Sequence, residues 1–252
     1  VGTVGPVVNM LIGLFLGLST GAGVVISQYY GAKREDKVHD AVHTAMVLTF
    51  ILCVVFTIVG VFITPLMVRL MNTPPEVVPE STTYLSIYFA GVTGLLVYNM
   101  GAAILRAVGD SRRPFYFLAA AAVINTVLDL LFVIKFHMGV AGVAYATIIA
   151  QGISAVLTLI TLARNPSCIR LVFRHLRIHR AMLSRILKVG IPAAIQTAIT
   201  CFSNVFVQSY INFFGADCMA GWTSYSKVDQ ILLLPMQSIG LSATTFVGQN
   251  LG

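Results

Sequence analysis

Charged side chains are scarce in this chain. Lys, Arg, Asp and Glu make up only 10% of its 252 residues, whereas a soluble globular domain has roughly 25%. Hydrophobic residues make up 57%, and the mean hydropathy is +0.88. So few polar groups cannot cover a folded chain in water. The composition excludes an ordinary soluble domain and indicates a protein of the bilayer.

Cysteine is also scarce, and no leader segment is visible. The four cysteines show neither paired nor metal-like spacing, so neither a disulfide framework nor a zinc site is expected; they are Cys53, Cys168, Cys201 and Cys218. The chain starts at Val1 with an apolar pattern and shows no basic start followed by a small-residue cleavage site. We expect a piece of a longer protein.

Long apolar runs fill most of the sequence. A helix needs about 20 apolar residues to cross the hydrocarbon core. Seven segments meet this length, which predicts an all-α polytopic bundle; they are Val4–Ile26, Asp40–Thr64, Thr82–Leu105, Pro114–Ile134, Gly139–Leu162, Lys188–Phe213 and Val228–Leu251.

Basic residues are concentrated in every second connection between these segments. The first, third and fifth connections hold most of them, including Lys33, Arg112 and Arg174, and the other three hold few. The positive-inside rule places the basic connections in the cytoplasm. We therefore expect a multi-pass protein of the plasma membrane that contacts anionic lipids. The net charge of +7 is divided among short loops, so no nucleic-acid partner is expected.

The fifth connection contains a basic amphipathic stretch, Ile169–Lys188. Its arginines Arg170, Arg174 and Arg177 fall at helical spacing between apolar residues. This pattern predicts a helix that lies on the cytoplasmic membrane face. A calmodulin-like target helix is the alternative.

Two stretches of the sequence resemble each other at a distance of 221 positions. "STGAGVVISQYYG" (Ser19–Gly31) aligns without gaps to "GLSATTFVGQNLG" (Gly240–Gly252). Both end at the cytoplasmic end of a span. Six spans separate them, an even number, so the two copies have the same orientation. Such a parallel repeat is a standard plan for secondary transporters.

Longer motifs point to a known family. The chain contains "NMLIGLFLGLSTGAGVVISQYYGAKRED", "YNMGAAILRAVGDSRRPFYFLAAAAVINTVLDLLFV", "MGVAGVAYATIIAQ" and "YSKVDQILLLPMQSIGLSATTFVGQNLG". It resembles the multidrug and toxic compound extrusion (MATE) family, in its bacterial drug/sodium-antiporter-like branch, from about the second to the eighth span. The resemblance implies a fragment of a twelve-span, two-lobed transporter that exports cationic or amphipathic compounds in exchange for protons or sodium ions, without another cofactor.

The resemblance also implies a division of the chain. Residues 1–163 would be the N-lobe without its first span, 164–187 a cytoplasmic basic linker, and 188–252 the start of the C-lobe. We expect a monomer.

An acidic residue lies inside the fourth apolar segment. Asp129 and Asn125 are four residues apart, so they share one helix face. An ionised side chain that faces lipid costs at least ~2.5 kcal/mol, so this face should turn inward. There the carboxyl group can hold a proton, or ionise and hold a cation. The alternative is a carboxylate that only bonds to a neighbouring helix. By resemblance, Asn125, Asp129 and Thr147 fall on the family's N-lobe cation site, which is also where a sodium ion would bind.

A second acid, Asp229, begins the last segment near its outer end. By resemblance it falls near the family's C-lobe acidic position. Lys227 is two residues away, so the two side chains do not share a helix face. A cation-site residue and an interfacial residue both remain open.

Polar residues also follow a ridge in the sixth segment. Gln196, Thr200, Asn204 and Gln208 recur every four residues, which predicts the lining of a cargo cavity. The alternative is hydrogen bonding between helices.

Other patterns have simpler interpretations. Gly13, Gly17 and Gly21 repeat a G-x-x-x-G spacing that lets helices approach closely. Ser19 within "GLSTG" matches a nucleophile elbow, but that elbow requires a strand-to-helix turn. His39 and His43 share a face with acids near a loop, where a solvated helix start is favoured over a metal site.

The sequence therefore favours an ion-coupled exporter over its rivals. A flippase for lipid-linked cargo is the alternative within the same superfamily, and it would need basic residues deep in the spans. We find no Lys or Arg deep in the first six segments, which favours cationic or neutral cargo. An intramembrane enzyme would need a catalytic pair, and none is found. A passive channel would not require a two-lobe repeat.

Overall fold

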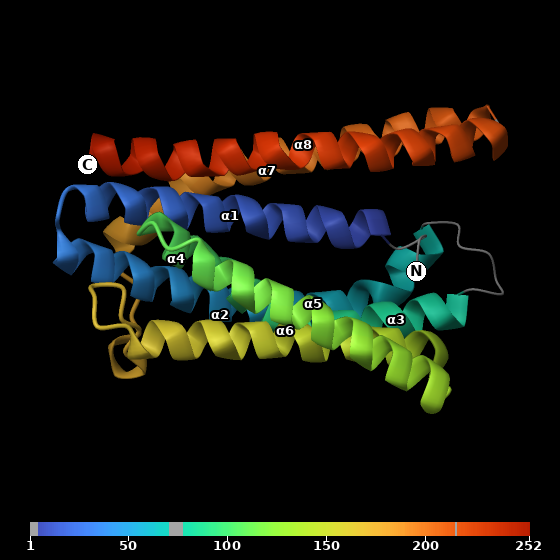
Figure 1. Ribbon diagram of the computed structural model, residues 1–252, viewed down its shortest axis with the longest axis horizontal. Helices are drawn as coiled ribbons and strands as arrows, with labels where there is room; N and C mark the ends of the chain where they lie inside the picture. The colour runs from blue at the N-terminus through green and yellow to red at the C-terminus, as the bar shows by residue number, and fades with distance from the viewer. Residues whose placement is uncertain (1–4, 71–77, 215) are drawn as a thin grey trace.

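The computed structural model describes residues 5–70, 78–214 and 216–252, and these form a bundle of long α-helices (Figure 1). No strand occurs in these ranges. The helices are α1 (Gly5–Gly31), α2 (Glu35–Leu70), α3 (Val78–Ala90), α4 (Val92–Ala107), α5 (Arg112–Leu130), α6 (Gly139–Arg164), α7 (Arg180–Phe213) and α8 (Ala216–Leu251), with a π-helical turn at Leu131–Lys135 and a 3₁₀ turn at Phe173–His175.

Six of these helices are long and apolar enough to cross a membrane unbroken. The segment expected at Thr82–Leu105 is instead divided into α3 and α4, which meet at an angle of 46°. The break lies at Gly91, where a Cβ atom would overlap the side chain of Ile148 on α6. Counting this bent pair as one span gives the seven segments expected from the sequence.

The basic connections lie together at one end of the bundle. Figure 1 shows that the loop between α1 and α2, the loop between α4 and α5, and the segment between α6 and α7 are all at the same end. We call this the inner end, following the positive-inside rule. The end of α2, the start of α3, the connection from the π-helical turn to α6, the end of α7 and the start of α8 lie at the opposite, outer end.

Helix α1 and helix α7 pack closely along the glycine-rich face of α1. A Cβ atom on Gly17 would overlap the backbone of Ala194, and one on Gly21 would lie 2.5 Å from the backbone nitrogen of Gly190. One on Gly13 would lie 2.7 Å from a methyl group of Thr197. The absence of side chains at these three positions is therefore what allows the two helices to approach.

The two copies of the internal repeat contact each other. Helices α1 and α8 run in the same direction, and their inner ends lie side by side (Figure 1). Gly31 meets Gln249, and its repeat equivalent Gly252 meets Gln28, which is the equivalent of Gln249. This reciprocal contact is what a two-fold axis along the membrane normal produces. The parallel repeat inferred from the sequence therefore forms an interface.

The segment between α6 and α7 differs from the expected surface helix. Residues 165–179 contain only the short 3₁₀ turn, and α7 begins at Arg180. Ile169 and Leu171 are buried while Arg170 between them is exposed. Residues 168–169 form a turn, in which the Arg170 N–H donates to the Ser167 carbonyl at 3.0 Å, and the Leu171 N–H donates to the Leu162 carbonyl of α6 at 3.0 Å. The helix prediction was wrong for residues 165–179, because the chain turns back onto the end of α6 there and buries Ile169 and Leu171.

Candidate functional site

The candidate ion site lies on α5, toward the outer end. Asn125 and Asp129 occupy successive turns of this helix, and the π-helical turn begins two residues after Asp129. A π-helical turn inside a helix is often associated with a functional site. Sequence periodicity gave no sign of it, because residues 131–135 are as apolar as an ordinary helical turn.

Both side chains of this pair have buried atoms without partners. The Oδ1 atom of Asp129 and the Nδ2 atom of Asn125 are inaccessible to solvent and form no hydrogen bond within the part of the chain that the structure describes. The carboxylate also acts electrostatically on Tyr84 of α3. Leaving buried polar groups unbonded costs about 1–3 kcal/mol each. Such groups in a native structure call for a ligand or another partner.

Helix α6, which packs against α5, carries the third predicted residue. Thr147 is half-buried, and its hydroxyl donates a hydrogen bond of 2.9 Å to the carbonyl of Val143. Its oxygen still has a lone pair that can accept a bond or hold a cation. One turn further along, the Oε1 atom of Gln151 is buried and also lacks a partner. Gln151 was missed in the sequence because a single amide in a helix has no distinguishing spacing.

Oxygen ligands on α5 and α6 suit a hard monovalent cation or a proton. Within the described ranges, no group of three or more His, Cys, Asp or Glu side chains is arranged to hold a metal ion. The four cysteines are free thiols. Asn125 and Asp129 therefore offer amide and carboxylate groups, and the Oδ1 atom of Asp129 is left without a hydrogen bond in the described ranges.

The second acid is on a different helix. Asp229 is half-buried on α8, and Lys227 two residues earlier is exposed. Helix α8 packs on α1 and α7, whereas α5 packs mainly on α6. The structure thus places Asp129 and Asp229 on helices that have different neighbours.

The polar ridge of α7 lies on the face that is turned away from α1. Gln196, Thr200 and Asn204 are exposed, whereas Gly190 and Ala194 are buried against α1. Thr200 donates a 3.0 Å hydrogen bond to the carbonyl of Gln196. The side chain of Gln208 lies outside the described residues. The described part of the ridge is therefore not used in the packing of α7 on α1.

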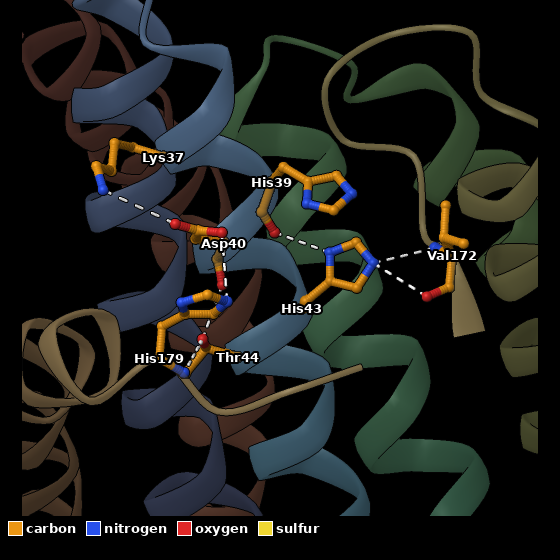
Figure 2. Close-up of polar contacts among 7 residues, drawn as sticks. All are labelled: Lys37, His39, Asp40, His43, Thr44, Val172 and His179. Atoms are coloured by element: carbon orange, nitrogen blue, oxygen red, sulfur yellow. Dashed lines mark hydrogen bonds and ion pairs between the residues drawn. The ribbon is translucent and has the colours of Figure 1, made fainter. Parts of the chain in front are cut away.

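The histidines near the start of α2 form a bonded cluster rather than a solvated helix start. Figure 2 shows the ring of His43 between the carbonyl of His39 and the backbone of Val172 in the segment after α6. His43 is only 1% exposed. Its Nδ1–H donates to the His39 carbonyl at 2.8 Å, and its Nε2 accepts the Val172 N–H at 3.1 Å. The expectation of a solvated start was wrong for His43 because residues from 129 positions away cover it.

Two further contacts hold the same segment to α2 (Figure 2). The Oγ1 atom of Thr44 accepts the backbone N–H of His179 at 3.1 Å. The Nε2 atom of His179 lies 3.3 Å from a carboxylate oxygen of Asp40, whose other oxygen lies 3.9 Å from Lys37. The segment between α6 and α7 is therefore held to α2 by contacts of His43, Thr44 and Asp40.

Arg106 is the main residue that the sequence did not single out. Arg106 follows the expected segment Thr82–Leu105 and was therefore assigned to a loop, but it lies in the last turn of α4. Its Nε atom is buried without a hydrogen-bond partner, as is the Oγ atom of Ser19 on α1. Nothing in the sequence could show that no carboxylate would face this arginine.

Comparison with known proteins gives consistent relatives. A family model described as MatE matches residues 1–131. The probable multidrug resistance protein YpnP of Bacillus subtilis (strain 168) is 36% identical over 193 residues, which are 77% of this chain and 43% of that protein. The probable multidrug resistance protein YoeA of the same organism is 29% identical over 254 residues, or 98% of this chain and 55% of that protein.

Solved structures agree with these matches. A crystal structure described as MATE in the bent conformation superposes with a TM-score of 0.91 at 25% identity, and the match covers 98% of this chain and 56% of that one. The chain therefore spans about half the length of the proteins it matches.

Proposed function

The chain belongs to the MATE family of multi-pass plasma-membrane transporters, and we propose that the complete protein is a secondary antiporter. It exports cationic or amphipathic compounds, and protons or sodium ions enter in exchange. The two halves of the bundle expose the cargo site to each side of the membrane in turn. Two relatives are named as probable multidrug resistance proteins, which supports this class of cargo.

One observation carries the coupling step of this proposal. The Asp129 carboxylate has a buried oxygen without a partner, one helical turn from an equally unbonded Asn125 amide. An antiporter needs one negative group that binds the coupling ion in one state and releases it in the other. A carboxylate already bonded to an arginine or a backbone amide would have less to gain from either ion. Asn125 and Thr147 complete an oxygen-rich site on α5 and α6.

The remaining residues take supporting roles in this mechanism. Gln196, Thr200, Asn204 and Gln208 would bind the cargo with neutral hydrogen-bonding groups, which suit chemically diverse compounds. Asp229 would supply a second cation site in the other half. Protons or sodium ions are the only cofactors that the mechanism requires.

The test is dye efflux from vesicles that contain the complete protein, driven separately by a proton gradient and by a sodium gradient. Asp129→Asn should reduce coupled efflux by at least about tenfold, which corresponds to a loss of ~1.4 kcal/mol in ion binding. Asp110→Asn is the matched control, because Asp110 is already paired with Arg113 at 3.4 Å in an inner loop. The gradient that drives wild-type efflux identifies the coupling ion. Efflux by Asp129→Asn at the wild-type rate would contradict the proposal.

A further inference from the structure

Arg106 occupies an unusual place at the inner end of the bundle. It projects from the last turn of α4 and lines a space that is also bordered by α1 and α8. Its Nε atom is buried without a partner, and no ion pair or hydrogen bond to its guanidinium occurs within the described ranges. Burial of a charge is costly unless the charge is paired. Arg106 as a whole is half-buried, so its charge is partly removed from solvent and has no negative partner among the described residues.

Two adjoining hollows meet at this arginine. The smaller has a volume of about 50 Å³ and the larger, more open one about 580 Å³. Both are lined by Arg106, Leu241 and Thr245. Neither lining contains an Asp or Glu residue. The space is thus positively charged, with no carboxylate to neutralise it.

A second hydrogen-bond donor lies in the smaller hollow. Ser19 is 3% exposed, and its Oγ atom has no partner. The hydroxyls of two other lining residues, Ser27 and Thr244, donate to carbonyls of their own helices at 2.9 and 2.8 Å. Ser19 is therefore a donor without a partner in the hollow that Arg106 also lines, and an anionic oxygen is the group that both can bind.

The nearby groups that could neutralise Arg106 are otherwise engaged. The Asp110 carboxylate pairs with Arg113 and accepts that residue's backbone N–H. The hydroxyl of Tyr98 donates to the carbonyl of Pro114 at 2.9 Å. A structural arginine would bond to the free carbonyls that end α4. The carbonyl of Ala107 is instead bonded by the side-chain amide of Gln249 at 2.8 Å.

We propose that Arg106 and Ser19 form a binding site for the phosphate group of an amphipathic anion. The guanidinium binds two phosphate oxygens in its planar fork, and Ser19 donates to one of them. Leu16 and Leu241 line the small hollow, and Phe246 lines the large one, so an apolar tail has a surface to lie on. This site is separate from the cation site at Asp129, which lies on α5 toward the outer end.

The proposed site lies between helices from distant parts of the chain. Ser19 lies on α1 and Arg106 on α4, whereas α8 carries Leu241, Thr245 and Phe246. A bound phosphate amphiphile would touch all three helices at the inner end. The two possible sources are a phospholipid of the inner leaflet and a phosphorylated solute from the cytoplasm.

The experiment uses the complete protein, purified in a neutral detergent. Isothermal titration with hexyl phosphate, and with hexanol as the uncharged counterpart, tests the solute source. Native mass spectrometry with phosphatidylglycerol tests the lipid source. Wild type should bind at least one of the two phosphate compounds and not hexanol. Arg106→Gln should weaken that binding about tenfold or more, because hydrogen bonds to charged groups are the strong ones. Ser19→Ala should weaken it by a smaller factor.

Three controls make the result decisive. Arg112→Gln removes an exposed arginine of the same inner end and should leave binding unchanged. Asp129→Asn should also leave it unchanged, so a failure of the antiport mechanism would not affect this test. The thermal midpoint of Arg106→Gln should not fall, since the substitution removes an unpaired charge. Equal binding of both phosphate compounds by wild type and Arg106→Gln, or binding by neither, would overturn the proposal.

Discussion

The histidine cluster at the start of α2 and the Asn125–Asp129 pair on α5 both place polar groups inside an apolar bundle, but only the cluster is bonded. His43 uses both ring nitrogens, and Thr44 accepts a backbone N–H from the segment after α6. Asp129 and Asn125 keep buried atoms without partners. Buried polar groups with partners hold a fold together, whereas those without partners cost stability. The difference separates polar groups that fix the structure from polar groups whose buried atoms have no partner in the described ranges.

The largest change in stability should follow from the loss of His43. His43→Ala leaves a cavity and removes the acceptor of the Val172 N–H, so it should lower the free energy of unfolding by about 2–3 kcal/mol. Unfolding of the complete protein in mixed micelles with increasing sodium dodecyl sulfate measures this. His175→Ala is the matched control, because His175 is an exposed member of the same cluster. Equal effects of the two substitutions would remove the anchoring role of His43.

A smaller loss should come from Thr44→Val. The substitution keeps the shape of the side chain but removes the oxygen that accepts the His179 N–H, which should cost about 1 kcal/mol in the same measurement. Thr49→Val is the control: Thr49 is also buried, but its hydroxyl bonds only to the carbonyl of Ala45 within α2. If Thr49→Val is as destabilising as Thr44→Val, the contact between segments contributes nothing.

The smallest change should follow from neutralising the unbonded acid. Asp129→Asn removes a carboxylate without partners, so the free energy of unfolding should stay the same or rise slightly, even though coupled efflux is lost. Asp40→Asn should lower it by about 0.5 kcal/mol, because Asp40 pairs with His179 and Lys37 near the surface. A clear destabilisation by Asp129→Asn would assign Asp129 to the bonded, structural class instead.

Much of the fold could be predicted from the sequence, because it depends on local composition. Apolar length located the spans, the spacing of the basic loops predicted that these loops lie at one end, and the 221-residue repeat indicated the parallel plan. The G-x-x-x-G spacing of α1 identified the face that packs on α7. The membrane makes such patterns informative, since every span must be helical and apolar.

The rest depends on contacts between distant residues. A contact with a residue from another part of the chain decides the turn before Leu171 and the burial of His43. The lack of a partner for the Nε atom of Arg106 depends in the same way on which residues surround it. The Asn125–Asp129 pair was predicted from its spacing, but its lack of partners was not. Gln151 joined the candidates only through its burial. A helical pattern identifies which residues share a face, and only the packed structure shows what that face meets.

The contact between the two repeat copies also constrains which residues the copies can share. Ser27 faces Gly248, the residue that takes its own place in the second copy, and a Cβ atom on Gly248 would overlap the Ser27 hydroxyl. Serine in both copies would overlap in this packing. The contact between the repeat copies therefore depends on the two copies having different residues at this position.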